Sequence, residues 1–399
     1  MGRGGRFGAL ATLVALACAT VSAAQDGREK RPAVDPYTHG DERALERAGY
    51  ISLGPFLIAD GHTTTAVDEA LGGAPILWIE TAHFRLGCSL DAYSVPKDQD
   101  ERRKLREELG RLGEKVPRVK SRSLKLDPWL RAHLYAQRLE DLYASFCSTL
   151  AVVPPDASDA PEAPRVGTPG KSVVLVFQRE SSLSRYTGTF CSGQRGDAYT
   201  EYFQGTGTFL FGISNEAIDA SDTDLHYGLV FGVSQNLTCS INGFTHVPPR
   251  WWTLGLARWF ARRVTPKVQL YIGKAGDALP PDELADWEAL VLGRVRANYY
   301  PDWASTFALK DTEGADFGDH IVLWSRVDYL LAQEDAVLKA LVNELHEPVP
   351  AMEDRDAFLA NRFDRAVMEA TSKSLEGLDA DWSRWVQEAY DPKRRKKRK

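Results

Sequence analysis

Residues Asp224 to Arg263 read DLHYGLVFGVSQNLTCSINGFTHVPPRWWTLGLARWFARR and are the most informative part of the chain about its fold. The pattern of this stretch predicts two helices, one that carries His226 and one over residues 251–264. The loop between them contains His246 and the pair Pro248-Pro249, and proline is tolerated at the first turn of a helix but not in its interior. The stretch is therefore interpreted as a helix, a loop and a second helix.

The residue pattern of both helices resembles the active site of a zinc peptidase. In a zincin, His-Glu-x-x-His lies on a helix, so that two histidines one turn apart hold the metal and the glutamate activates a water molecule. In the gluzincin branch, a following helix supplies the third ligand from a segment similar to Pro-Pro-Trp-Leu-x-Glu-Gly-Leu-Ala-Glu-Tyr-Phe. Residues 248–260 here read PPRWWTLGLARWF. On these residues the chain resembles the gluzincin (peptidase MA-like) domains of bacterial secreted proteins.

The resemblance places the zinc-binding positions on residues that do not bind zinc. His226 falls on the first histidine and Tyr227 on the glutamate base. Val230 falls on the second histidine and Leu254 on the glutamate ligand. Because catalytic zinc needs three protein ligands, one surviving ligand without a base implies an inactive site. The resemblance thus implies the fold without the activity, and we expect no catalytic residue, no metal and no cofactor.

The resemblance also implies an α+β, zincin-like fold over residues 75–391. Its upper lobe, residues 75–246, would combine a mixed sheet with helices, and its lower lobe, residues 247–391, would be mostly helical. Residues 25–74 are expected to be a partly flexible N-terminal segment with a short strand near 51–60, and residues 392–399 a basic tail.

Local patterns predict the elements of this fold. Asp127 followed by Pro128 is typical of a helix start, and the charged stretch 98–116 predicts a solvent-facing helix. Alternating or continuous apolar residues predict strands over 76–86, 171–178 and 206–214. Further helices are expected at 65–71, 180–186, 282–294, 318–333, 334–345, 355–370 and 379–389.

Residues 1–24 have the pattern of a secretory signal peptide. Arg3 and Arg6 precede the apolar stretch 9–19, and small residues at 22–24 provide a cleavage site. We therefore expect a periplasmic or extracellular protein. Lipoprotein anchoring through Cys18 is disfavoured because leucine is misplaced in the lipoprotein pattern. No later segment has the roughly 20 apolar residues that span a bilayer.

Four cysteines follow the signal peptide: Cys88, Cys147, Cys191 and Cys239. An even count in an exported chain predicts two disulfides. Among the three possible connectivities we favour Cys88–Cys147 with Cys191–Cys239, and buried thiols are the alternative.

Charge is distributed unevenly along the chain. The formal net charge of −6 combines +2 on residues 1–24 and +7 on residues 393–399, which leaves −15 on residues 25–392. An acidic body excludes a general nucleic-acid binder, which needs a basic folded surface. The basic tail is expected to be a solvated end, with contact to an anionic surface as the alternative.

The sequence contains no Gly-x-Ser-x-Gly elbow, phosphate loop or dinucleotide-binding glycine pattern. It therefore predicts an exported pseudoenzyme that binds a peptide or a cell-envelope ligand in the former substrate cleft. The cleft is expected near His226, Tyr227, Trp251, Trp252 and Arg258. Two alternatives stay open: a hydrolase with a rearranged metal site around His226, His246 and Asp224, and an envelope-tethering protein that acts through its basic tail.

Overall fold

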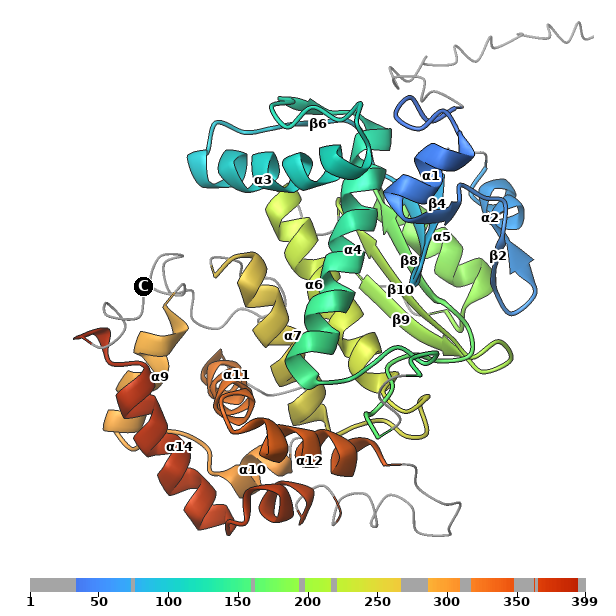
Figure 1. Ribbon diagram of the computed structural model, residues 1–399. Coiled ribbons are helices and arrows are strands. Elements are labelled where there is room, and N and C mark those ends of the chain that lie inside the picture. Colours follow the sequence, from blue (N-terminus) through green and yellow to red (C-terminus); the bar gives the residue numbers. More distant parts are fainter. Residues whose placement is uncertain are drawn as a thin grey trace, which may run out of the picture. The chain divides into compact units, whose positions relative to one another are not determined.

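The computed structural model contains a six-stranded mixed sheet, which lies on the right in Figure 1. Strands β5, β8 and β10 run parallel to one another, and the remaining neighbours are antiparallel. The expectation of a fold that mixes helices with a mixed sheet is therefore confirmed. In order across the sheet, the strands are β1 (Tyr50–Ser52), β4 (Leu77–Thr81), β5 (Phe84–Ser89), β8 (Ser172–Phe177), β10 (Thr208–Ser214) and β9 (Ala198–Phe203).

The structure describes residues 34–72, 76–158, 162–193, 198–216, 221–266, 286–308, 317–347, 362 and 365–393. Residues from Ala33 onward form one compact unit. The predicted signal peptide, most of the helix predicted at 355–370 and most of the basic tail lie outside the described residues.

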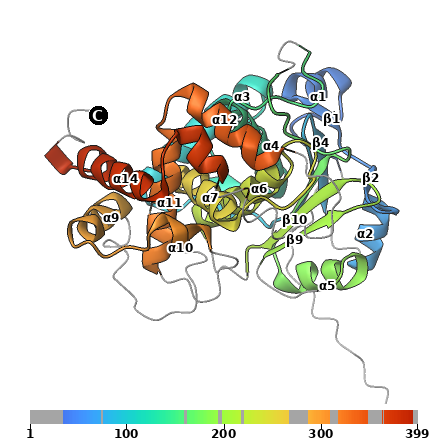
Figure 2. The same ribbon diagram turned by 90° about the horizontal axis from the view of Figure 1, so that it is seen from below.

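Strand β8 is buried on both faces of the sheet, as its continuous apolar sequence predicts. Val174 and Val176 belong to the larger core cluster, together with residues of helices α4 (Pro128–Leu150) and α6 (Asp222–Cys239). Val173 and Leu175 belong to the second cluster, with residues of α2 (Thr64–Ala70) and α5 (Glu180–Phe190). Helices thus cover both faces, with α5 on the side of the sheet away from α6 and α7 (Arg250–Val264) (Figure 2).

Two helices of the larger cluster, α4 and α6, begin where the sequence carries capping residues. The Asp127 carboxylate accepts a hydrogen bond from the backbone N–H of Leu130, and Pro128 is the first residue of α4. Ser221 and Asp224 form a reciprocal capping box at the start of α6. These caps satisfy N–H groups that have no partner inside the helix. The helix start predicted at Asp127 and Pro128 is therefore confirmed.

Two glycines allow α6 and α7 to approach their neighbours closely. A Cβ atom at Gly232 of α6 would lie 2.0 Å from the ring of Phe211 on β10. A Cβ atom at Gly255 of α7 would lie 2.3 Å from the side chain of Val327 on α11 (Phe317–Leu331). The two glycines therefore fix α6 against the sheet and α7 against the helices that follow it.

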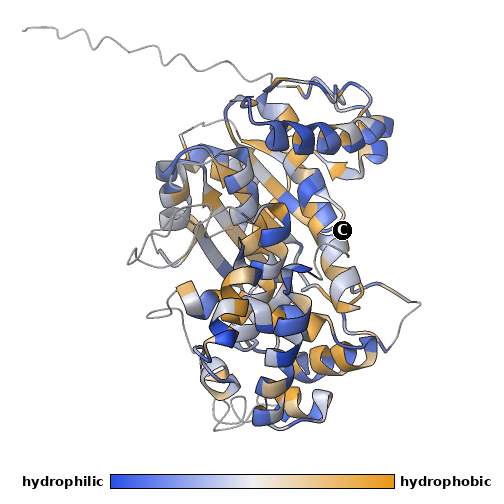
Figure 3. Ribbon diagram, turned by 90° about the vertical axis from the view of Figure 1, so that its left-hand side faces the viewer, coloured by the Kyte–Doolittle hydropathy of each residue, from blue (hydrophilic) through white to orange (hydrophobic). Residues whose placement is uncertain are grey.

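Three sequence predictions about the elements are corrected. Residues 76–86 form a hairpin of β4 and β5 rather than one strand. Strand β1 comes from the predicted N-terminal segment but is an edge of the main sheet. Helix α3 (Gln99–Lys115) has the hydrophilic character expected (Figure 3), yet it buries one face that includes Leu105, Glu108 and Leu109.

The remaining described elements complete the fold. The helices predicted at 318–333, 334–345 and 379–389 are confirmed, and α9 begins at Trp287 within the range predicted for it. No helix among the described residues is both long enough and apolar enough to cross a membrane. These elements are α1 (Glu42–Ala48), α9 (Trp287–Arg296), α10 (Trp303–Phe307), α12 (Asp335–His346), α14 (Leu375–Ala389), β2 (Leu57–Ala59), β3 (His62–Thr63), β6 (Tyr93–Ser94) and β7 (Lys125–Leu126).

Candidate binding site

Helices α3, α4, α6 and α7 line an open pocket of about 220 Å³ beside the first turns of α6, here called the His226 pocket. The pocket combines charged groups with an apolar wall. Its lining residues are Lys104, Glu108 and Arg111 of α3, Arg138, Asp141, Leu142 and Ser145 of α4, His226 and Val230 of α6, and Phe260, Arg263 and Val264 of α7.

The pocket contains two of the four positions that the resemblance assigned to zinc chemistry. His226 and Val230 lie one turn apart on α6 and both line the pocket. Tyr227 and Leu254 are buried and are not part of its lining. The position of the first histidine therefore faces a surface that a ligand can reach, whereas the position of the base does not.

The sequence predicts a cleft around Trp251 and Trp252, and the burial of both side chains corrects this prediction. Neither side chain is accessible to solvent. The centre of the Trp251 ring lies 5.3 Å from the centre of the Phe307 ring and 6.2 Å from that of the Trp303 ring. The indole nitrogen of Trp252 donates to Nε2 of His346 at 3.3 Å. Because both side chains are fully buried, they do not line a cleft. They join α7 to α10 and α12 instead, and each buries a large apolar area there.

Arg258, which stands where the family has a second carboxylate, is also buried. Its guanidinium lies 4.6 Å from the centre of the Phe231 ring, and its Nη1 donates to the Tyr227 hydroxyl at 3.4 Å. The cation is therefore held by aromatic groups inside the packed interface of α6 and α7.

A network of buried charged groups adjoins the pocket and shares Glu108 and Arg138 with its lining. Nη2 of Arg138 lies 2.7 Å from a carboxylate oxygen of Glu108 and 2.7 Å from one of Asp222. The hydroxyl of Tyr135 donates to Asp222 at 3.0 Å, and Nη2 of Arg131 lies 3.7 Å from the same carboxylate. All of these groups are nearly inaccessible to solvent. Buried charges persist when they are paired in this way.

His226 adjoins this network without a hydrogen bond to it. Its Nδ1 is 3.9 Å from Oε1 of Glu108 and has no hydrogen-bond partner among the described residues. Burial, together with the positive charges of Arg138 and Lys104, lowers the pKa of His226 well below its usual value. The imidazole is therefore neutral at pH 7, with one N–H donor and one acceptor nitrogen.

Lys104 is the partly exposed cation of the pocket. Its Nζ donates to the carbonyl of Val264 at 3.0 Å. Burial and the charge of Arg138 lower the pKa of Lys104 to about 8, against the opposing effect of Glu108. The ammonium is thus mostly protonated at pH 7 and loses its charge within the mildly alkaline range.

The structure does not bring together the residues of the alternative metal site. Nε2 of His246 donates to the carbonyl of Leu345 at 2.9 Å, and Asn242, which follows α6, contacts the carbonyl of His346. His226 lies in the first turns of α6, a helix about 27 Å long. The two histidines therefore lie at opposite ends of α6. The described residues contain no group of three His, Cys, Asp or Glu side chains placed to hold a metal ion.

Cys88, Cys147 and Cys239 lie in three different elements, Cys191 directly follows α5, and no disulfide joins any of the described residues. Cys147 lies on α4 and Cys239 ends α6. Burial raises the pKa of Cys147 to about 11 and that of Cys239 to about 12, so both are thiols at neutral pH. The two predicted pairings stay predictions.

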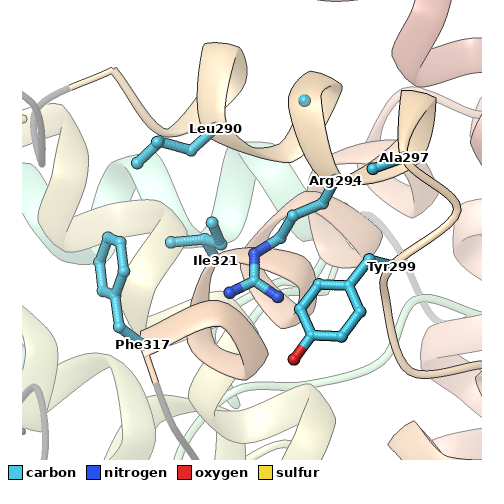
Figure 4. A pocket seen from close by; sticks show the side chains of 7 residues that line it. Leu290, Arg294, Ala297, Tyr299, Phe317 and Ile321 are labelled. Atoms are coloured by element: carbon cyan, nitrogen blue, oxygen red, sulfur yellow. The ribbon is translucent and has the colours of Figure 1, made fainter. Parts of the chain in front are cut away.

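A second pocket lies between α9 and α11, and none of the site residues expected from the sequence lines it (Figure 4). The Arg294 side chain extends across the pocket, and its guanidinium carbon lies 5.3 Å from the ring centre of Tyr299. The other lining residues are Leu290, Gly293, Ala297, Phe317 and Ile321. This mainly apolar pocket does not include a cluster of polar groups that would orient a ligand.

Sequence reasoning missed the charged half of the His226 pocket. Lys104 and Glu108 lie on the helix that was expected to face solvent, and Arg138 lies on α4. A signal for the inward face of α3 exists, because Leu105, Leu109 and Leu112 recur at helical spacing and all three are buried.

No protein-family model, curated protein or solved structure matches this chain.

Proposed function

We propose that the protein is an exported, catalytically inactive peptidase-like protein that binds a peptide or a cell-envelope ligand in the His226 pocket. The observation that carries the proposal is the position of the pocket. It is lined by His226 and Val230, the residues at the two histidine positions of the zinc-peptidase pattern, and by four basic side chains.

The arrangement of the elements supports a zincin-like fold for this chain. Helix α6 packs against the mixed sheet, and α7 follows it through the Pro248-Pro249 loop and packs along it. Helices α9 to α14 come after α7, as the resemblance implies for a mostly helical lower lobe.

The side chains around His226 support binding rather than hydrolysis. Tyr227 replaces the base, and its hydroxyl contacts Arg258 inside the core. Glu108, the carboxylate nearest to His226, is paired with Arg138. A general base must reach the proton that it removes, and this carboxylate is held by a buried guanidinium instead.

The proposal predicts that filling the pocket abolishes binding. We expect the protein to bind synthetic peptides of mixed sequence on an array, or purified peptidoglycan in a sedimentation assay, and to release the peptides uncleaved. Ser145→Trp places a large ring in the pocket lining and should weaken binding by at least about tenfold, because a built-in clash disfavours the bound state.

A matched variant one residue away provides the control. Ala144 is exposed on α4 and is not part of the pocket lining, so Ala144→Trp should leave binding unchanged. Equal binding by both tryptophan variants, absence of binding to both materials, or cleavage of the bound peptides would contradict the proposed function.

A further inference from the structure

The charge of the His226 pocket is opposite to that of the chain around it. Its lining contains four basic residues, Lys104, Arg111, Arg138 and Arg263, and two acidic residues, Glu108 and Asp141. The formal charge of the lining is therefore +2, although residues 25–392 carry −15. A concave site whose net charge is positive concentrates negatively charged ligands.

Two buried side chains of the lining have hydrogen-bonding atoms without protein partners. Nε and Nη1 of Arg138 and Nδ1 of His226 have no hydrogen-bond partner among the described residues. The Arg138 and His226 side chains are only 2% and 9% exposed. A buried donor without a partner costs about 1–3 kcal/mol, and both side chains belong to residues that line the pocket. A polar ligand that reaches these atoms would therefore gain hydrogen bonds that the protein does not supply.

We propose that the ligand of the His226 pocket presents a carboxylate, which lies between Lys104 and Arg138 and hydrogen-bonds to His226. This inference rests on the proposed function and specifies its ligand chemistry. Lys104 directs one of its three donors to the carbonyl of Val264, a residue that also lines the pocket. The acidic group is a side chain or chain end of the bound peptide or polymer.

The composition of the lining favours an acidic group that carries one negative charge, such as each carboxylate of an acidic peptide, over a group that carries two. Asp141 pairs with Arg111 at 2.9 Å, and Glu108 pairs with Arg138 at 2.7 Å, so these two carboxylates repel any additional negative charge. The formal charge of +2 is sufficient for one carboxylate, and charge-assisted hydrogen bonds to guanidinium and ammonium groups are stronger than neutral ones.

The test compares two end-blocked peptides of equal length, tetraglutamate and tetraglutamine, by titration calorimetry with the full protein. We expect tetraglutamate to bind at least about tenfold more tightly than tetraglutamine, because only the former supplies charge-assisted hydrogen bonds. Lys104→Gln should reduce the affinity for tetraglutamate by about tenfold and leave that for tetraglutamine unchanged.

The control for Lys104→Gln is Arg103→Gln on the neighbouring position of α3. The Arg103 side chain is 71% exposed, pairs with Asp100 and does not line the pocket. This variant removes the same charge from the same helix, so it corrects for any long-range electrostatic effect. It should change the affinity for tetraglutamate by less than about twofold.

The pH profile separates a direct role of Lys104 from a structural one. The affinity for tetraglutamate should fall as the pH rises through about 8, where the Lys104 ammonium loses its proton. In Lys104→Arg the cation stays charged, so tight binding should persist at pH 9. The charged groups that face Lys104 are Glu101 and Glu108 of α3, Arg138 of α4, Asp222 of α6 and Arg263 of α7.

The outcomes distinguish this inference from the proposed function. If Ser145→Trp abolishes ligand binding but tetraglutamate and tetraglutamine bind equally, or neither binds, the carboxylate inference is wrong and the pocket remains a binding site. If Lys104→Gln and Arg103→Gln weaken tetraglutamate binding equally, the acidic peptide binds through general electrostatics, which also overturns the inference.

Discussion

Replacement of Asp222 by alanine should lower the free energy of unfolding by about 3–5 kcal/mol, the usual cost of removing one partner from a buried ion pair. The Asp222 carboxylate lies 2.7 Å from Nη2 of Arg138 and accepts a hydrogen bond from Tyr135. Without the Asp222 carboxylate, Glu108 would be the one carboxylate of this network left to balance the buried guanidiniums of Arg131 and Arg138. Denaturation by urea, followed by circular dichroism, measures the loss.

Asp100→Ala is the matched control for this variant. The Asp100 side chain is 69% exposed and pairs only along the surface of α3 with Arg103. Exposed pairs of this kind contribute about 0–1 kcal/mol. A loss for Asp222→Ala as small as that for Asp100→Ala would show that the network does not stabilise the fold.

The contribution of Asp222 to the stability of the fold depends on pH. Burial raises the pKa of Asp222, but the charges of Arg138 and Arg131 outweigh burial and lower it below its usual value of 3.8. A carboxylate with a lowered pKa in the folded state stabilises the protein above its unfolded pKa, and this contribution is lost as the pH falls through the folded pKa. The stability difference between wild type and Asp222→Ala should therefore be constant above pH of about 4 and shrink below it.

Trp251→Ala should also lower the free energy of unfolding by about 3–5 kcal/mol, because it removes a fully buried indole and leaves a cavity. The Trp251 ring is in contact with the rings of Trp252, Trp303 and Phe307, so the packing of α7 against α10 is lost. At a temperature where the variant is folded, its affinity for tetraglutamate should equal that of the wild type, because Trp251 does not line the pocket.

The exposed residue Leu124 provides the control for the tryptophan. Leu124 is 63% exposed, and Leu124→Ala should change stability by less than about 0.5 kcal/mol. A Trp251→Ala protein of normal stability that no longer binds its ligand would contradict the core position of this indole and restore the cleft expected from the sequence.

The elements that can be predicted from the sequence are those marked by residues close together in the chain, such as a capping residue, a proline or a continuous apolar run. The start of α4 at Pro128 depends on a cap and a proline next to each other, and β8 is a continuous apolar run between polar ends. The hairpin of β4 and β5 lacks a glycine or proline at its turn. Its turn is closed instead by Thr81, whose hydroxyl exchanges hydrogen bonds with the backbone of Phe84. No residue type there indicates a turn.

The site was predictable only in part, for a related reason. The pattern of residues on α6 pointed to His226 and Val230, and both line the pocket. Charged side chains are almost never buried unless they are paired, and Glu108 finds its partner thirty positions away on another helix. The inward direction of Glu108 and Arg138 therefore depends on tertiary packing that a single sequence does not display.

The zinc content of the purified protein, without a histidine tag and after exposure to zinc and desalting, is the decisive measurement for an inactive peptidase site. Elemental mass spectrometry should find well below one equivalent, because His226 is the only one of the three ligand positions that keeps a ligand. Near-stoichiometric zinc in the wild type that is lost in His226→Ala would contradict the inactive site and establish a metal centre instead.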